Sequence, residues 1–171
     1  MDPSPFQLKI TDRLLFSSSA IIQDIEAMCD AGQASMAYFY FDFRDINKQH
    51  WRDLVSSLLI QLSAKSGPRC DILSRLHFNH DCGARQPHDD VLTRCLKEML
   101  MLPEQRPIYL IFDALDECSN ISRIPTPRKR VLQLVKELVD LHICVTSCPE
   151  VDIRDVLEAL TSRRLSLRDE S

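Results

Sequence analysis

Three acidic residues that follow a short apolar run have the types and spacing that could do chemistry. Residues 108–112 (IYLIF) lead into Asp113, and Asp116 and Glu117 come three and four positions later. In an open parallel sheet, ligands collect at the carboxyl ends of the strands, so Asp113 would direct a carboxylate toward Mg²⁺ through water. Asp116 and Glu117 would orient or deprotonate the water that attacks a γ-phosphate. This is a Walker B pattern; the alternative is an Asp113 that caps the next helix beside two solvated acids.

Glycine is scarce, which limits how a phosphate could be held. The 171 residues include three glycines, at positions 32, 67 and 83. Neither GxGxxG nor GxxxxGK[ST] can be assembled from these positions, so glycine-rich phosphate loops are excluded. The net charge, 21 − 25 = −4, argues against nucleic acid as a partner. The apolar fraction of 44% is that of a folded globular protein.

Seven cysteines, an odd number without a CxxC pair, favour free thiols in a reducing, cytoplasmic compartment. The N-terminus has no basic region followed by an apolar stretch, so no signal peptide is expected. No apolar stretch approaches the roughly 18 residues of a membrane span, and we expect no membrane association. One loop-like window could be drawn as a zinc site, although its spacing matches no standard zinc finger: Cys70, His77, His80, Cys82 and His88.

The elements that must position these residues alternate along the chain. Apolar residues at steps of three and four predict helices in five segments: 21–29, 51–62, 91–100, 131–138 and 151–160. Short apolar runs predict strands between them: 36–43, 108–112, 142–147, 164–168 and, weakly, 6–10. This alternation predicts an α/β fold, a mostly parallel sheet with helices on both faces. The loosest segment is 63–90, and the basic residues 128–130 are interpreted as a solvated face at a helix start rather than phosphate ligands.

Four of these segments, FDALDEC at 112–118, MAYFYFDFRD at 36–45, WRDLVSSLLIQLS at 51–63 and VTSCPE at 145–150, together resemble one family. They are similar to the NACHT NTPase domain, of the nephrocystin-three-like N-terminal type common in large fungal signalling proteins. The resemblance runs from about residue 17 to 171. It implies a P-loop NTPase of the STAND branch, in which the nucleotide state switches a signalling protein between closed and oligomerising forms.

The resemblance also implies roles for particular residues. Asp113 would hold Mg²⁺ with ATP or GTP, and Asp116 and Glu117 would act in hydrolysis. Protein partners, or self-association through NACHT surfaces, would be the mode of interaction. Residues 17–171 would form a partial NACHT-like domain, and residues 1–16 a divergent lead-in that replaces the phosphate loop.

Two departures from the family pattern bear on activity. The family has GxxGxGK[ST] before its first helix, whereas this chain has no glycine before Gly32. That loop supplies the backbone N–H cradle, the lysine and the hydroxyl for a Mg-nucleotide. The family also has Thr-Ser-Arg-Pro-Glu where this chain has Cys148 in place of the phosphate-sensing arginine, and a thiol cannot make the bidentate contact of a guanidinium. We therefore predict that the chain neither binds ATP or GTP tightly nor hydrolyses it.

The missing loop also raises a question about the sheet. By resemblance the strand order would be 2-3-4-1-5, with the phosphate-loop strand as strand 1. Residues 6–10 are the segment that could fill this central place, followed by a turn at 11–13, because an empty place would leave two unpaired strand edges. Backbone pairing of 6–10 with 142–147 would test this.

Three interpretations of function remain open from the sequence. The first is a degenerate or truncated NACHT module without catalysis. The second is an active STAND ATPase or GTPase whose phosphate loop is missing from this chain. The third is a non-catalytic scaffold that binds other NACHT proteins through its exposed sheet edge or its helices.

Overall fold

A computed structural model describes residues 9–12, 15–103, 106–120, 125–138, 141–148, 150–160 and 163–165. Five parallel strands form one sheet in the order β2-β3-β4-β1-β5. The strands are β1 (Lys9–Asp12), β2 (Ser35–Tyr40), β3 (Ile108–Asp113), β4 (His142–Ser147) and β5 (Arg163–Leu165). The helices are α1 (Leu15–Asp30), α2 (Trp51–Ser63), α3 (Gly67–Asn79), α4 (Asp89–Leu100), α5 (Pro127–Glu137) and α6 (Val151–Leu160).

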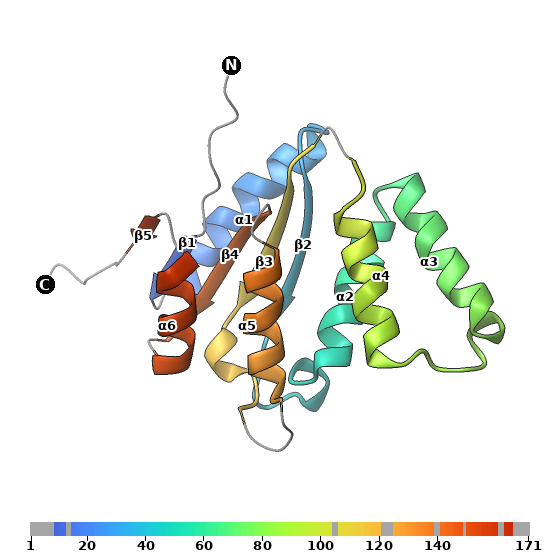
Figure 1. Ribbon diagram of the computed structural model, residues 1–171. Coiled ribbons are helices and arrows are strands. Elements are labelled where there is room, and N and C mark those ends of the chain that lie inside the picture. Colours follow the sequence, from blue (N-terminus) through green and yellow to red (C-terminus); the bar gives the residue numbers. More distant parts are fainter. Residues whose placement is uncertain are drawn as a thin grey trace, which may run out of the picture.

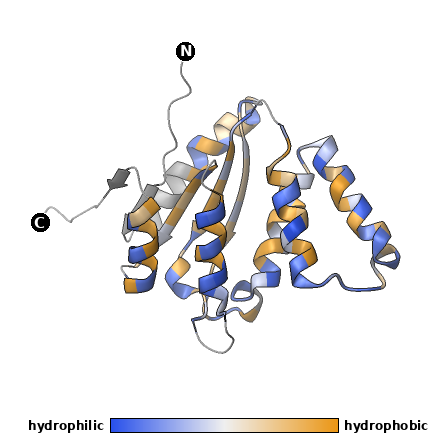
Figure 2. Cartoon of the chain, in the orientation of Figure 1, coloured by the Kyte–Doolittle hydropathy of each residue, from blue (hydrophilic) through white to orange (hydrophobic). Residues whose placement is uncertain are grey.

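Helices cover both faces of the sheet, as the alternating pattern predicts (Figure 1). One face packs Leu110, Phe112 and Val145 into the larger core, together with apolar residues of α2, α4, α5 and α6. The opposite face packs Ile111 and Cys144 against α1. Figure 2 shows that the helices carry hydrophobic and hydrophilic residues in alternation along their length.

The predicted helices are present, and their local signals explain their bounds. The apolar stripe of α2 is buried in full. α5 begins after Thr126, whose side chain accepts a hydrogen bond from the Lys129 N–H at 3.3 Å, with Pro127 in the first turn. α1 ends before Gly32, whose φ of 71° lies in the left-handed region that favours glycine.

The strand order 2-3-4-1-5 expected from the resemblance is confirmed, and the central place is filled from the N-terminal segment. The filling strand is β1, which pairs with β4 from Lys9↔Cys144 to Asp12↔Ser147. The predicted turn at 11–13 is therefore wrong for Thr11 and Asp12, because pairing with β4 continues through both. Residues 6–8 of the expected strand, and 166–168 of the expected last strand, lie outside the described residues.

The expectation that residues 63–90 form the loosest segment is wrong for its first half, where α3 is a helix of 13 residues. Gly67-Pro68 looks like a helix breaker, but here Pro68 lies in the first turn, where its missing N–H costs no hydrogen bond. α3 packs on α2 and α4, away from the sheet (Figure 1), and its weak apolar stripe buries Ile72 together with the whole side chain of Arg69. Among the described residues, no helix combines the length and apolar character needed to cross a membrane.

Candidate functional site

The carboxyl ends of β1, β3 and β4 meet at one edge of the sheet because all strands run in the same direction. Phe112 pairs with Val145, so the next residues, Asp113 and Thr146, lie side by side. The Thr146 hydroxyl donates a hydrogen bond to Oδ1 of Asp113 and accepts one from the Ala114 N–H at 2.9 Å. Thr146 is buried. The carboxylate predicted to hold Mg²⁺ is therefore oriented by a buried side chain on the neighbouring strand.

A sharp turn follows Asp113 and places the two later acids. Ala114 has φ 55° and ψ 49°, a left-handed conformation that is uncommon for a residue with a Cβ. A single turn of 3₁₀ helix, Leu115–Glu117, comes next, closed by the Cys118 N–H donating to the Leu115 carbonyl at 3.1 Å. Leu115 points into the core and Asp116 and Glu117 are half-buried. Because of this turn, the carboxylates of Asp113, Asp116 and Glu117 do not all point the same way.

Each of the two later acids accepts a hydrogen bond from the backbone of a neighbouring loop. Asp116 Oδ1 accepts from the Cys148 N–H at 2.9 Å, at the end of β4. Glu117 Oε2 accepts from the Phe43 N–H at 3.2 Å, in the loop after β2. The acids that the sequence predicts as a catalytic pair therefore connect β3 to both of its neighbours in the sheet.

The pKa of the Tyr40 phenol reflects the negative charge at this edge of the sheet. Burial raises the pKa of Tyr40, and the nearby carboxylates of Glu117, Asp42 and Asp113 raise it further. The charge of Arg44 partly offsets this rise, and Lys48 lies 5.5 Å from the centroid of the Tyr40 ring. The phenol therefore stays neutral at physiological pH and does not add another anion.

Cys148 is exposed at the end of β4, next to Ser147. The chain thus brings Asp116 and Cys148 together through the hydrogen bond between the Cys148 N–H and the Asp116 carboxylate. Glu117 lies on the other side of the turn, toward Phe43. In the described part of the chain, no group of three or more His, Cys, Asp or Glu side chains could hold a metal ion. The zinc alternative at residues 70–88 therefore has no support.

Arg128 is a residue of this edge that the sequence analysis placed wrongly. It was predicted to lie on a solvated face, yet it is 4% exposed. Its spacing gives the signal: Arg128 lies three and four residues before Val131 and Leu132, on the buried stripe of α5. A charge at such a position needs partners inside the protein, and Arg128 finds them in the turn after β3 and the turn after β4.

The connection between β1 and α1 is the other feature that defines this edge. β1 ends at Asp12 and α1 begins at Leu15, so Arg13 and Leu14 alone separate them. A phosphate loop of the GxxxxGK[ST] type needs eight residues between strand and helix. The register places the end of β1 beside Ser147 of β4. The place where a phosphate loop would stand is therefore next to the acids and is spanned by two residues.

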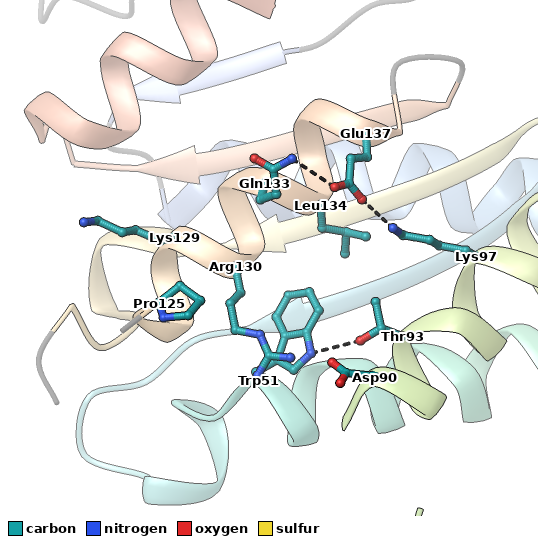
Figure 3. A pocket seen from close by; sticks show the side chains of 10 residues that line it. All are labelled: Trp51, Asp90, Thr93, Lys97, Pro125, Lys129, Arg130, Gln133, Leu134 and Glu137. Carbon is teal, nitrogen blue, oxygen red and sulfur yellow. Dashed lines mark hydrogen bonds and ion pairs between the residues drawn. The ribbon is translucent and has the colours of Figure 1, made fainter. Parts of the chain in front are cut away.

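Two cavities among the described residues lie between α2, α4 and α5, and the smaller one extends along α4 and α5 as far as Lys97 and Glu137. One, of about 360 Å³, is shown in Figure 3; a larger one, of about 960 Å³, shares Trp51, Pro125 and Arg130 with it. Arg130 stacks over the Trp51 ring at 4.7 Å and pairs with Asp89 at 3.1 Å.

Several other polar groups of the smaller cavity are paired with one another (Figure 3). The Trp51 Nε1–H donates to the Thr93 hydroxyl at 3.2 Å, and Lys97 donates to Glu137 at 2.5 Å. These groups bond one another within the protein and do not converge on a ligand. The acidic edge remains the candidate site.

Solved structures with the same architecture place this fold in a class. The chain is similar to Cdc6p from Pyrobaculum aerophilum (TM-score 0.54, 9% identity, 94% of this chain and 38% of that chain). It is also similar to the Orc1 protein from Aeropyrum pernix, solved in complex with DNA (TM-score 0.57, 11% identity, 99% of this chain and 41% of that chain). The chain thus spans about two fifths of these structures. It has the α/β fold of the P-loop NTPases of the AAA+ type.

The chain belongs to the family described as Nephrocystin 3, N-terminal, whose model matches residues 16–148. The resemblance stated from the four sequence segments is confirmed at this level. The matched range begins inside α1, after the β1–α1 connection, and ends at Cys148. No protein of curated function matches the chain.

Proposed function

We propose that this chain is a NACHT-type signalling module of the fungal STAND class that works without binding or hydrolysing nucleotide. The observation that carries the proposal is the two-residue connection between β1 and α1. Phosphates are held in this fold by successive backbone N–H groups of a long loop at the N-terminus of the first helix. Arg13 and Leu14 cannot supply such a cradle, and the chain has no glycine near them.

The bonding of the acids supports the same conclusion. Asp113, Asp116 and Glu117 accept hydrogen bonds from Thr146, the Cys148 N–H and the Phe43 N–H, respectively. These bonds give the acids a structural task, tying β3 to β4 and to the loop after β2. An ionised acceptor makes such a bond worth about 1.5–3 kcal/mol when it is well shielded. The Walker B segment would persist for this reason after loss of the phosphate loop.

The residues of this edge fit a Mg-nucleotide poorly. Asp113 could contribute one carboxylate to Mg²⁺, as the family does, but the hydroxyl and the lysine of the missing loop have no counterpart between β1 and α1. Cys148 cannot replace the arginine that senses the terminal phosphate. We therefore propose that neither ATP nor GTP with Mg²⁺ is a tightly bound cofactor of this chain.

The second candidate is an active STAND ATPase or GTPase whose phosphate loop is supplied from outside this chain. It is favoured by one observation: Asp113 and Asp116 stand at the correct edge, close to the position after β4 that carries the sensor in the family. A nucleotide would then bind only together with the polypeptide that carries the loop.

We propose proteins, including other NACHT domains, as the partners, and no nucleic acid or membrane. The net charge of −4 supports the first exclusion. All seven cysteines are free, which supports a cytoplasmic location. The sheet edge at β2 is not open to a partner strand at its centre, because Gln61 of α2 bonds both the N–H and the carbonyl of Tyr38. Helix surfaces are therefore the better contact for a partner.

Thermal unfolding with Mg-ATP or Mg-GTP tests the proposal. A ligand present at 100 times its Kd stabilises the folded state by about 2.7 kcal/mol, which raises the Tm of a domain of this size by roughly 5–10 °C. We expect no such increase for the wild-type chain at millimolar nucleotide. An increase that Asp113→Ala abolishes would contradict the proposal.

A matched gain-of-function variant makes a negative result informative. Replacing Arg13-Leu14 by a GxxxxGKT loop, together with Cys148→Arg, restores the two lost features in the same fold. We expect this double change to produce nucleotide-dependent stabilisation that Asp113→Ala removes, while Cys148→Arg alone produces none.

A further inference from the structure

A single buried guanidinium connects the two turns that carry the candidate site residues. Arg128, in the first turn of α5, has a side chain that is 5% exposed. Its Nε donates to the Cys118 carbonyl at 3.1 Å and one terminal nitrogen donates to the Asp116 carbonyl at 2.5 Å. Both acceptors belong to the turn that follows β3. One end of the guanidinium is thus fixed to the main chain of the Walker B segment.

The other terminal nitrogen of Arg128 faces the turn that follows β4. It donates to Oε2 of Glu150 and lies 3.5 Å from Oδ1 of Asp152. Glu150 immediately precedes α6, and Asp152 lies in its first turn. The same planar group therefore holds backbone carbonyls on one side and carboxylates on the other.

Asp152 is a second carboxylate beside the guanidinium, and its side chain is partly exposed with one oxygen buried. Oδ2 of Asp152 is buried and has no hydrogen-bond partner among the described residues. A carboxylate in that position is costly unless a cation lies close to it. Arg128 is the cation beside it, so α5 stabilises the first turn of α6 through this contact.

We propose that Arg128 is a positioning residue that couples the turn after β3 to the turn after β4, so that the two move as one unit. The Asp116–Cys148 hydrogen bond spans the same two turns closer to the sheet. The first link runs from the Asp116 carbonyl through Arg128 to Glu150, and the second joins the Asp116 carboxylate to the Cys148 N–H. Because Glu150 and Cys148 belong to the same turn, the two links connect the turns twice. The inference rests on the proposed function, in which the two turns have a structural role. It implies that a conformational change at the acidic edge is transmitted to α6.

Lysine would not serve in place of Arg128. The contacts recruit all three nitrogens of a rigid, planar fork toward acceptors on opposite sides. An ammonium concentrates its donors at one point and cannot reach both turns. Coupling therefore depends on the guanidinium shape and not on positive charge alone.

Residue-resolved amide hydrogen exchange, without nucleotide, tests the coupling. The reporter in the first turn is the Cys118 N–H, which bonds the Leu115 carbonyl, and the reporter in the second is the Arg154 N–H, which bonds the Glu150 carbonyl. Glu150→Gln alters only the second turn directly. If the turns are coupled, Glu150→Gln accelerates exchange at Cys118 by about tenfold, although Glu150 does not touch that turn. Arg128→Lys accelerates both reporters.

A matched control is Arg130→Met, which removes the Asp89 ion pair from the same helix and should leave both reporters unchanged. If Glu150→Gln accelerates exchange at Arg154 alone, the coupling proposal is overturned and Arg128 is a local anchor. If Arg128→Lys fails to fold, Glu150→Gln and Asp152→Asn still decide the question by the same readout. Nucleotide titration of the wild type reports on the proposed function separately, so either proposal can fail without the other.

Discussion

The backbone N–H of Cys148 donates a hydrogen bond to Oδ1 of Asp116 at 2.9 Å, across 32 positions of the sequence. Asp116 follows β3 and Cys148 follows β4, so the bond closes the carboxyl edge between two adjacent strands. In the family pattern these are the positions of a hydrolytic acid and a phosphate-sensing side chain. Here the Asp116 carboxylate bonds the backbone N–H of Cys148. This contact does not depend on the side chain at position 148, so it does not need the arginine of the family pattern.

Removal of the Asp116 carboxylate should lower the stability of the fold, and a substitution that keeps an acceptor oxygen should lower it less. Asp116→Ala removes the acceptor, and we expect a loss of about 1–2 kcal/mol in the free energy of unfolding. Asp116→Asn keeps an oxygen at the same place and should retain at least half of that stability. Urea denaturation followed by circular dichroism measures both. Asp71→Ala, at an exposed acid of α3, should change stability by no more than about 0.5 kcal/mol; equal losses for Asp116→Ala and Asp116→Asn would count against the structural role.

The edge of the sheet at β2 offers a second test. Gln61 Oε1 accepts from the Tyr38 N–H at 3.0 Å, and its Nε2 donates to the Tyr38 carbonyl at 2.8 Å. This side-chain amide occupies the place of a neighbouring strand's peptide group and shields an edge that would otherwise pair with another chain. Gln61→Ala should lower the free energy of unfolding by about 1–2 kcal/mol and produce self-association that increases with concentration.

Light scattering after size-exclusion chromatography measures that association. Ser57→Ala removes a 2.9 Å contact to Gln61 Nε2 while leaving both Tyr38 bonds, and should keep the wild-type elution profile. A Gln61→Ala protein that elutes as the wild type does at all concentrations would show that the edge needs no such protection.

The sequence predicted most of the fold because the relevant signals are local. The buried stripe of α2 and the capping pair at Thr126-Pro127 are readable as spacing and residue type. The central place of β1 was predicted from a long-range requirement, that a parallel sheet with an empty middle position leaves unpaired edges. Its bounds differ because the extent of a strand is decided by the partner, here β4, and not by the segment itself.

The candidate site was only partly predictable. The apolar run before them indicates Asp113, Asp116 and Glu117. The hydrogen bonds of Thr146, Arg128 and Gln61, in contrast, reach residues that are distant in the sequence. A lone threonine or glutamine has no spacing that reveals a bond to a distant strand. Arg128 could have been found, since it lies on the buried side of a helix, but a run of three basic residues looks like a solvated patch.

Six of the seven cysteines should divide into two classes by reactivity, with the partly buried Cys29 between them. Cys70, Cys82 and Cys148 are exposed, whereas Cys95, Cys118 and Cys144 are buried. Burial raises the pKa of the Cys118 thiol to about 12, against a smaller lowering by Arg128, so almost no reactive thiolate forms at pH 8. Iodoacetamide at that pH should modify the three exposed cysteines and leave Cys118 unmodified. Peptide mass spectrometry identifies the sites.

Two variants sharpen the thiol experiment. Cys148→Ser should remove one rapidly modified site without altering the others. Fast modification of Cys118 in the folded protein would show that the turn after β3 opens readily, which would contradict its being held by Arg128 and Asp116.

His142 should make stability depend on pH near neutrality. Its ring stacks on Tyr109 with centroids 4.7 Å apart, and burial lowers its pKa below the ordinary value of 6.5. Between the lowered folded pKa and the unfolded value, the unfolded chain binds more protons than the folded one, so stability falls as the pH falls below about 6.5. His142→Phe keeps a stacked ring but binds no proton, and its Tm should decline less than that of the wild type between pH 7.5 and 5.5. His77→Gln, at an exposed histidine of α3, should follow the wild-type curve. Parallel curves for wild type and His142→Phe would show that protonation of this ring does not oppose folding.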